Sequence, residues 1–194
     1  MIKLALLRHG HTEWNHAGRI QGRTDVPLEA EAAAALAALE LPANWRNAAL
    51  VASPLNRAVQ TAELVAQRAP TKIASLMEMD WGDWEGLRGV DLREQTDGAF
   101  RDIEHWGWNY TPPNGESPAQ IAHRLTPWLT TLSTDTVAVC HIGIMRVLLA
   151  QATGWNFDGP APFRIKRNRL FILNIDEKEL TFEPEQPRLV ERVL

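Results

Sequence analysis

Residues 4–15 read Leu-Ala-Leu-Leu-Arg-His-Gly-His-Thr-Glu-Trp-Asn, and this stretch decides the fold class. The apolar run that ends at Leu7 is typical of a strand that is buried on both faces. Arg8, His9 and Gly10 follow at its carboxyl end, which is where open α/β sheets bind ligands. Arginine is a permanent cation, neutral histidine is a nucleophile, and glycine lets a ligand approach the backbone. The stretch therefore predicts a sheet edge suited to attack on phosphorus.

Predicted strands and helices alternate along the rest of the chain. Strand patterns lie at residues 2–7, 49–52, 71–74 (weak), 136–140 and 170–175, and helix patterns at 29–41, 53–68, 117–132 and 143–153. This alternation predicts an α/β fold, a three-layer α/β/α sandwich with a mostly parallel central sheet. No helix pattern follows Arg169, so we expect an antiparallel edge near the C-terminus.

Residues with strong positional preferences mark the ends of these helices. Ser53 reads as an N-cap, followed by a proline in the first turn. Ser117 repeats this pattern, and Gln120 completes a capping box. Gly154 stands where a helix over 143–153 should stop.

Composition limits the class of protein. The 194 residues fit a single domain over 1–194. A net charge of −4 argues against a nucleic-acid partner or an anionic membrane surface. No apolar run is long enough to span a membrane, and the N-terminal apolar segment is too short for a signal peptide. The single cysteine, Cys140, fits a reducing compartment. We therefore expect a cytoplasmic protein, and the sequence is compatible with a homodimer.

Polar groups follow three predicted strands, and the carboxyl ends of parallel strands share one sheet edge. The groups are residues 8–10, residues 53–57 with Arg57, and residues 141–143 with His141. Two arginines and two histidines therefore meet in one crevice. One neutral imidazole would act as the nucleophile, and the second, protonated, would share the charge of a phosphate.

A phosphoryl transfer site also needs a proton donor for the leaving group. Glu78 is the best candidate, because apolar neighbours would raise its pKa and keep it protonated. Asp80, Asp83 and Glu85 lie nearby, and spacing alone does not exclude them.

Five ordered segments resemble the histidine phosphatase superfamily, also called phosphoglycerate mutase-like. They are residues 6–15, 18–28, 53–62, 78–86 and 139–143. The resemblance implies that His9 is the nucleophile and passes through a phosphohistidine, while Glu78 is first general acid and then general base. It implies that the phosphoryl oxygens are held by Arg8, Arg57 and His141, and that Asn15, Gln21 and Gly22 line the phosphate or substrate side. We also expect Ile142 to contact the substrate. Neither a metal nor an organic cofactor is implied.

The chain departs from the family at one position of the site. The family commonly has His-Gly-Gly where this chain has His141-Ile142-Gly143, so we expect the isoleucine either to narrow the pocket or to turn the local backbone. Residues 112–117 resemble a segment of the smaller phosphatases, including those similar to α-ribazole phosphatase, although they also read as a turn before a capped helix. We therefore expect a metal-independent phosphatase whose partner is a small phosphorylated metabolite.

Other interpretations stay open at this point. The same residues would serve a phosphoglycerate mutase-type transfer between substrate hydroxyls. A non-catalytic protein that binds a phospho-ligand is a second alternative. A third is a metal-binding protein that uses His9, His11 and His16, although a closed site lacks a fourth ligand.

Residues 80–113 are rich in tryptophan and read as loops with at most one short helix. The four tryptophans there either contact a ring-bearing leaving group or pack these loops onto the core. They are Trp81, Trp84, Trp106 and Trp108.

Overall fold

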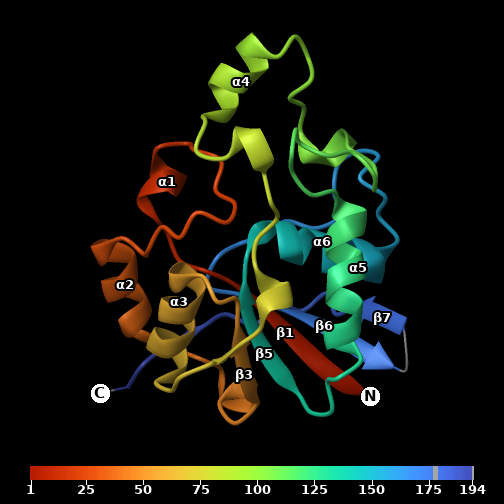
Figure 1. The fold of residues 1–194 in the computed structure, drawn as a ribbon. Helices are drawn as coiled ribbons and strands as arrows, with labels where there is room; N and C mark the ends of the chain where they lie inside the picture. Colours follow the sequence, from red (N-terminus) through yellow and green to blue (C-terminus); the bar gives the residue numbers. More distant parts are fainter. Residues whose placement is uncertain (177–178, 194) are drawn as a thin grey trace.

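The computed structural model describes residues 1–176 and 179–193, so the predicted domain over 1–194 includes three positions outside the described residues. A six-stranded sheet has the strand order β4-β3-β5-β1-β6-β7 (Figure 1). Its strands are β1 (Ile2–Arg8), β3 (Ala49–Ala52), β4 (Thr71–Lys72), β5 (Thr136–Cys140), β6 (Leu170–Asp176) and β7 (Glu179–Phe182). The first four are parallel, and β6 and β7 form the antiparallel edge. The predicted fold class is confirmed.

Strand β1 shows why its apolar run is continuous. The side chains of Leu4 and Leu6 belong to one hydrophobic cluster, and those of Ala5 and Leu7 belong to another. All four are fully buried. Successive side chains of a strand point to opposite faces, so a strand covered on both sides needs apolar residues at every position.

Helices cover both faces of this sheet (Figure 1). One cluster joins the sheet to α2 (Ala30–Ala37) and α3 (Asn56–Ala66), and the other joins it to α5 (Pro118–Leu129) and α6 (Ile142–Thr153). The shorter α1 (Glu13–His16) and α4 (Gly89–Gln95) lie beyond the carboxyl edge of the sheet. This edge therefore faces the loops and not a helical layer.

Several predicted helix boundaries differ from the structure, and two of the differences have a clear physical cause. Helix α3 begins at Asn56 with Leu55 as its N-cap residue, so Ser53 and Pro54 stay in the loop. The helix predicted over 29–41 ends at Ala37, because residues of β2 (Leu39–Glu40) pair with β8 (Val190–Glu191). Tertiary pairing here overrides the helix preference of the alanine-rich run.

Other end signals act as predicted. The Ser117 hydroxyl accepts a hydrogen bond from the Gln120 N–H, and the Gln120 side chain completes the capping box. Gly154 ends α6 in the left-handed conformation, with φ of 74°.

Residues 80–113 contain α4 and two 3₁₀ turns, η3 (Gly82–Trp84) and η4 (Ile103–His105). Two more such turns lie earlier in the chain, η1 (Ala43–Trp45) and η2 (Ala74–Leu76).

Within the described part of the chain, every helix is too short or too polar to cross a bilayer.

Candidate active site

The register of the parallel strands brings the predicted residues together. Strand β1 pairs with β5 so that Arg8 lies opposite Cys140, which makes His9 and His141 the next facing pair. The His9 N–H donates to the Cys140 carbonyl at 3.0 Å, and the two imidazole centroids lie 5.1 Å apart. Strand β3 ends beside them, since the Ser53 N–H donates to the Val139 carbonyl at 3.0 Å.

The hydrogen bond of His9 fixes which ring nitrogen is free. Its Nδ1 lies 2.7 Å from the Gly10 carbonyl oxygen. A carbonyl only accepts, so Nδ1 carries the proton and Nε2 carries the lone pair. Burial lowers the pKa of His9 well below 6.5, and the Arg57 and Arg8 cations lower it further. His9 is therefore a neutral imidazole with a free Nε2.

His141 is also held in its neutral form. Arg57 Nε donates to His141 Nδ1 at 3.3 Å, and His141 Nε2 lies 2.7 Å from Ser53 Oγ. An imidazolium would have no lone pair for the arginine, so the proton sits on Nε2. Burial and the neighbouring His9 and Arg57 hold the pKa of His141 well below 6.5. The expected protonated second histidine is wrong for this arrangement, because the arginine supplies the local positive charge.

Arg57 is fully buried, and backbone carbonyls fix its guanidinium. Its Nη1 donates to the Thr24 carbonyl at 2.8 Å and its Nη2 to the Gly22 carbonyl at 2.6 Å. A Cβ on Gly22 would lie 2.9 Å from the Met79 carbonyl oxygen, so only glycine fits there. The structure thus places Gly22 as a holder of Arg57, whereas the sequence predicted it on the substrate side.

Glu78 sits at the amino end of α6. Its Oε1 accepts a hydrogen bond from the Met79 N–H at 2.8 Å, and its Oε2 accepts one from the Gly143 N–H at 3.2 Å. Burial raises the pKa of Glu78 above 4.5, although these bonds and the Arg57 cation act in the opposite direction. A Cβ on Gly143 would collide with Glu78 Oε1, which explains why glycine stands at that position.

The three rival carboxylates are engaged elsewhere. Asp80 Oδ2 forms an ion pair with Arg23 Nη1 at 3.3 Å, and Asp83 accepts a hydrogen bond from the Asn114 amide at 3.0 Å. Glu85 accepts the Thr24 N–H. Of the four candidate carboxylates, Glu78 is the one that lines the same cavity as His9.

A cavity of about 170 Å³ opens on this group. Among the described residues, its walls are formed by Arg8, His9, Asn15, Arg19, Ile20, Gln21, Glu78, Trp81 and Ile142. Arg57, His141 and Gly22 form a hydrogen-bonded layer next to these walls. Gln21 accepts hydrogen bonds from Thr12 and Asn15, while its buried Nε2 has no partner in the described part of the chain.

Arg8 is a cation at this cavity. Burial and the nearby Arg167 lower its pKa to about 10, so it stays protonated at neutral pH. Its buried Nε has no hydrogen-bond partner among the residues described. The arginine is thus available to a ligand oxygen.

A sequence model of the histidine phosphatase superfamily (branch 1) matches residues 4–184. The chain belongs to the histidine phosphatase superfamily. The predicted recognition is confirmed, and the relatives include both phosphatases and probable mutases.

Two curated relatives illustrate this range. Glucosyl-3-phosphoglycerate phosphatase of Mycolicibacterium vanbaalenii is 33% identical over 175 residues, which cover 80% of this chain and 76% of that protein. Probable phosphoglycerate mutase GpmB of Salmonella paratyphi C is 32% identical over 129 residues, or 64% of this chain. The match spans 60% of the mutase's length, which is less than two thirds.

Solved structures share the fold over nearly the whole chain. TTHB049 from Thermus thermophilus has a TM-score of 0.74 at 28% identity and covers 97% of this chain and 99% of its own. The α-ribazole phosphatase from Shigella flexneri has a TM-score of 0.73 at 25% identity, covering 94% and 95%. YhfR from Bacillus stearothermophilus reaches 0.80 at 25% identity with the same coverage.

Sequence patterns did not reveal two residues at the site of this superfamily member. Ser53 read as a helix cap, but its hydroxyl contacts His141. Arg167 lies outside any helix or strand, and its guanidinium donates to the His9 carbonyl at 3.1 Å and to Asn15 Oδ1 at 2.8 Å. Only tertiary contact reveals Arg167, since no motif surrounds it.

Ile142, where the family commonly has glycine, lies between two cavities. Besides the active-site cavity it lines a second one of about 150 Å³, whose walls also contain Arg146 and Arg164. Burial lowers the pKa of Arg146, while the Glu78 carboxylate raises it. The isoleucine therefore lines both the active-site cavity and a second cavity whose charged residues are Arg146, Arg164 and Glu104.

The tryptophans of residues 80–113 lie in different surroundings. Trp81 lines the active-site cavity. Trp84 and Trp106 are buried in the core, and Trp108 packs edge-to-face on Phe157. Packing of loops onto the core therefore accounts for three of the four.

Proposed function

We propose that this chain is a metal-independent phosphatase that hydrolyses a small phosphomonoester through a phosphohistidine on His9. One observation carries the proposal. The bond from His9 Nδ1 to the Gly10 carbonyl leaves the Nε2 lone pair free, in a cavity that Arg8 and Glu78 also line. A neutral, fixed imidazole beside a cation and a carboxylic acid suits nucleophilic attack on phosphorus.

In the first step His9 Nε2 attacks phosphorus and the ester P–O bond breaks. The leaving oxygen takes the proton of the Glu78 carboxyl, which its raised pKa keeps available. The products of this step are the alcohol, a Glu78 carboxylate and a phosphorylated His9.

In the second step Glu78 acts as a base. Its carboxylate takes a proton from water while the water oxygen attacks phosphorus, and the P–N bond breaks. Inorganic phosphate leaves, and His9 returns to its neutral form with Glu78 protonated again.

Fixed donors would hold the phosphoryl oxygens during both steps. Two buried nitrogens, Arg8 Nε and Gln21 Nε2, have no hydrogen-bond partner among the described residues and could donate to these oxygens. The Arg57 cation, whose Nε donates to neutral His141, stabilises the phosphoryl charge from the adjoining layer, and Asn15 lines the cavity. Such preorganised groups stabilise the charge of a phosphoryl transition state without reorganising.

The surrounding charge supports a particular class of substrate. Arg146 and Arg167 add positive charge around the phosphoryl site, where Glu78 is the buried carboxyl and the carboxylates of Glu104 and Asp102 act on Arg146. A phosphorylated metabolite that bears a second acidic group would complement the positive charge of these arginines. The name of the Mycolicibacterium relative specifies such a phosphate ester for that protein.

The test is phosphate release from p-nitrophenyl phosphate in EDTA by the wild type, His9→Ala and His123→Ala. His123 is exposed on α5 and serves as the matched control. We expect metal-independent release that falls at least about 10³-fold in His9→Ala and is unchanged in the control. Equal release by His9→Ala would overturn the proposal.

The mutase alternative needs a second assay. The protein is incubated with a phosphoglycerate, and migration of the phosphoryl group between hydroxyls is compared with release of inorganic phosphate. The proposal predicts release without migration. Migration faster than release would establish a mutase instead.

A further inference from the structure

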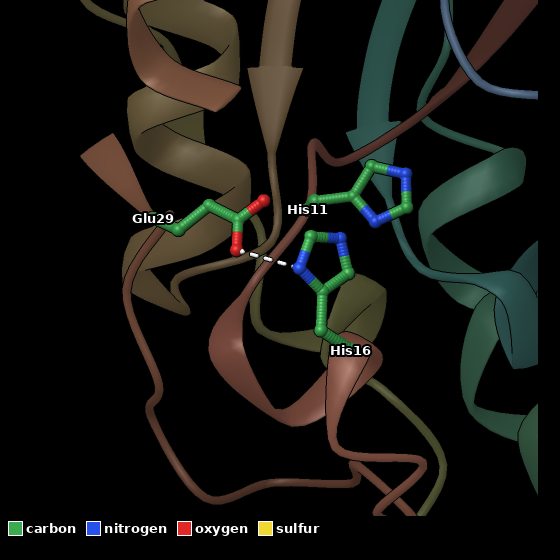
Figure 2. Close-up of side chains that lie close together, drawn as sticks. All are labelled: His11, His16 and Glu29. Atoms are coloured by element: carbon green, nitrogen blue, oxygen red, sulfur yellow. Dashed lines mark ion pairs between the residues drawn. The ribbon is translucent and has the colours of Figure 1, made fainter. Parts of the chain in front are cut away.

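Three side chains with metal-binding atoms gather beside the active-site loop (Figure 2). They are His11, which follows β1, His16 at the end of α1, and Glu29 at the N-cap of α2. Their ligand atoms all lie within 4.8 Å of one another. Figure 2 shows the Glu29 carboxylate facing the His16 ring, with the His11 ring on the other side of the His16 ring in this view.

This group differs from the histidine trio that the spacing suggested. His9 is turned away to Gly10 and His141, so a site made of His9, His11 and His16 is wrong. Glu29 stands where the third ligand was expected. Its contribution was not visible in the sequence, because a loop of more than ten residues separates it from His16.

We propose that His11, His16 and Glu29 form a binding site for a divalent transition-metal ion of the zinc class. Two imidazole nitrogens and one carboxylate oxygen are a donor set that such ions prefer. A tetrahedral ion with bonds of about 2.0–2.2 Å holds neighbouring ligand atoms about 3.3–3.6 Å apart. His16 Nδ1 and Glu29 Oε2 already lie 3.2 Å apart.

The third ligand has a nitrogen to offer. His11 Nδ1 is buried, and no hydrogen-bond partner for it exists among the described residues. An ion could therefore bind this atom without breaking a hydrogen bond. Capture of the ion requires a small inward movement of the ligands, because their separations reach 4.8 Å.

The backbone holds two of the three ligands in place. The Glu29 N–H donates to the His11 carbonyl at 3.1 Å, which ties the active-site loop to the start of α2. His16 is free to adjust, since 61% of its side chain is exposed. This exposure also leaves a fourth coordination position for water, as in open three-ligand sites.

Charge sets a limit on the affinity. Arg167 repels positive charge at His11, while the Glu29 carboxylate attracts it. We therefore expect weaker binding than in a closed four-ligand site. A bound ion would link the segment that follows His9 to α2, and so would stabilise this segment without entering the reaction.

The test titrates metal-free protein with Zn²⁺ by calorimetry and with Co²⁺ by visible absorption. We expect one ion per chain, a Co²⁺ spectrum typical of four-coordinate nitrogen and oxygen ligation, and a Tm that rises with Zn²⁺. Loss of a residue that only hydrogen-bonds to a metal ligand already weakens metal binding about 10–100-fold. His16→Ala and Glu29→Gln, which remove ligands, should weaken it at least about 100-fold.

Two controls separate this site from others on the chain. His123→Ala removes an exposed histidine outside the cluster and should bind as the wild type does. His9→Ala should also retain binding, since His9 is not a ligand. Tm values in EDTA confirm that each variant is folded. Absence of saturable binding, binding unaffected by His16→Ala and Glu29→Gln, or binding lost in His9→Ala would each overturn the proposal.

Discussion

At the scale of single residues, Glu78 and His9 have pKa shifts in opposite directions. Burial lowers the pKa of His9 below 6.5 and raises that of Glu78 above 4.5. The reaction needs neutral His9 and protonated Glu78. For an alkyl phosphate, kcat/KM should therefore rise with pH as His9 loses its proton and fall as Glu78 loses its own.

Replacing the acid tests this assignment. Glu78→Gln should lower kcat/KM for an alkyl phosphate about 10²–10⁴-fold and remove the falling limb of the pH profile. The loss should be smaller for p-nitrophenyl phosphate, whose leaving group needs no proton. Asp80→Asn serves as the control and should keep both limbs. Equal losses on the two substrates would contradict a proton-donating role for Glu78.

Arg57 should not tolerate lysine. A planar guanidinium contacts two carbonyls and His141 at once, and an ammonium cannot reproduce this geometry. Arg57→Lys should therefore lower kcat about 10²–10³-fold, while the more exposed Arg23→Lys leaves it near the wild-type value. Steady-state kinetics of the two variants decide the point, and a fully active Arg57→Lys would exclude the role.

The sequence predicted the residues of the site better than their contacts. His9, Arg57 and His141 follow strand ends, so their meeting is a consequence of the sheet. The role of Ser53 was hidden, because a serine before a proline also reads as a helix cap. Arg167 has no local pattern at all, since its position depends on the packing of an irregular segment against the site.

At the scale of elements, α5 depends on its N-terminal cap. The Ser117 hydroxyl accepts a hydrogen bond from the Gln120 N–H, and the Gln120 side-chain oxygen accepts one from the Ser117 N–H. Ser117→Ala should lower the free energy of unfolding by about 1 kcal/mol, as measured in urea. Ser133→Ala, in an exposed loop, should change it by less than about 0.5 kcal/mol. A neutral Ser117→Ala would mean that the capping box contributes nothing.

The first residue of α6 should control substrate size. Ile142 forms part of both the active-site cavity and the arginine-lined cavity beside it. Ile142→Gly would join them, so kcat/KM for bulky phosphomonoesters should rise relative to that for p-nitrophenyl phosphate. Ile142→Val keeps a branched wall and should leave the ratio near the wild-type value. An unchanged ratio in Ile142→Gly would show that Ile142 does not separate the cavities.

The sequence predicted an element correctly where burial of that element in the fold dictates its residue pattern. Strand β1 is apolar at every position because both of its faces are buried. The end of α2 was not predictable, since it depends on pairing of Leu39–Glu40 with Val190–Glu191 from the far end of the sequence. The composition of an alanine-rich run does not indicate which distant residues will pair with the end of that run.

At the scale of the whole molecule, the buried histidines should make stability depend on pH. His9 and His141 stay neutral in the folded state below 6.5, whereas the unfolded chain binds protons there. Each should cost up to about 1.4 kcal/mol of stability per pH unit as pH falls. Glu78 acts in the opposite sense, because its raised pKa makes the folded state bind a proton above 4.5.

On unfolding at acidic pH the two histidines take up more protons than Glu78 releases, so the free energy of unfolding should decline below about pH 6.5. Urea denaturation at a series of pH values measures this decline. His141→Asn should show a shallower slope than the wild type, and His123→Ala should show the same slope. A wild-type stability that is flat below this pH would contradict the buried neutral histidines.

The most direct test of the central claim is to trap the covalent intermediate. Wild type and Glu78→Gln are mixed with p-nitrophenyl phosphate, quenched in alkali, which preserves phosphohistidine, and digested for peptide mass spectrometry. We expect one phosphoryl group on His9, which accumulates in Glu78→Gln because water is no longer activated. Steady phosphate release with His9 unmodified, or a phosphoryl group on another residue, would contradict it.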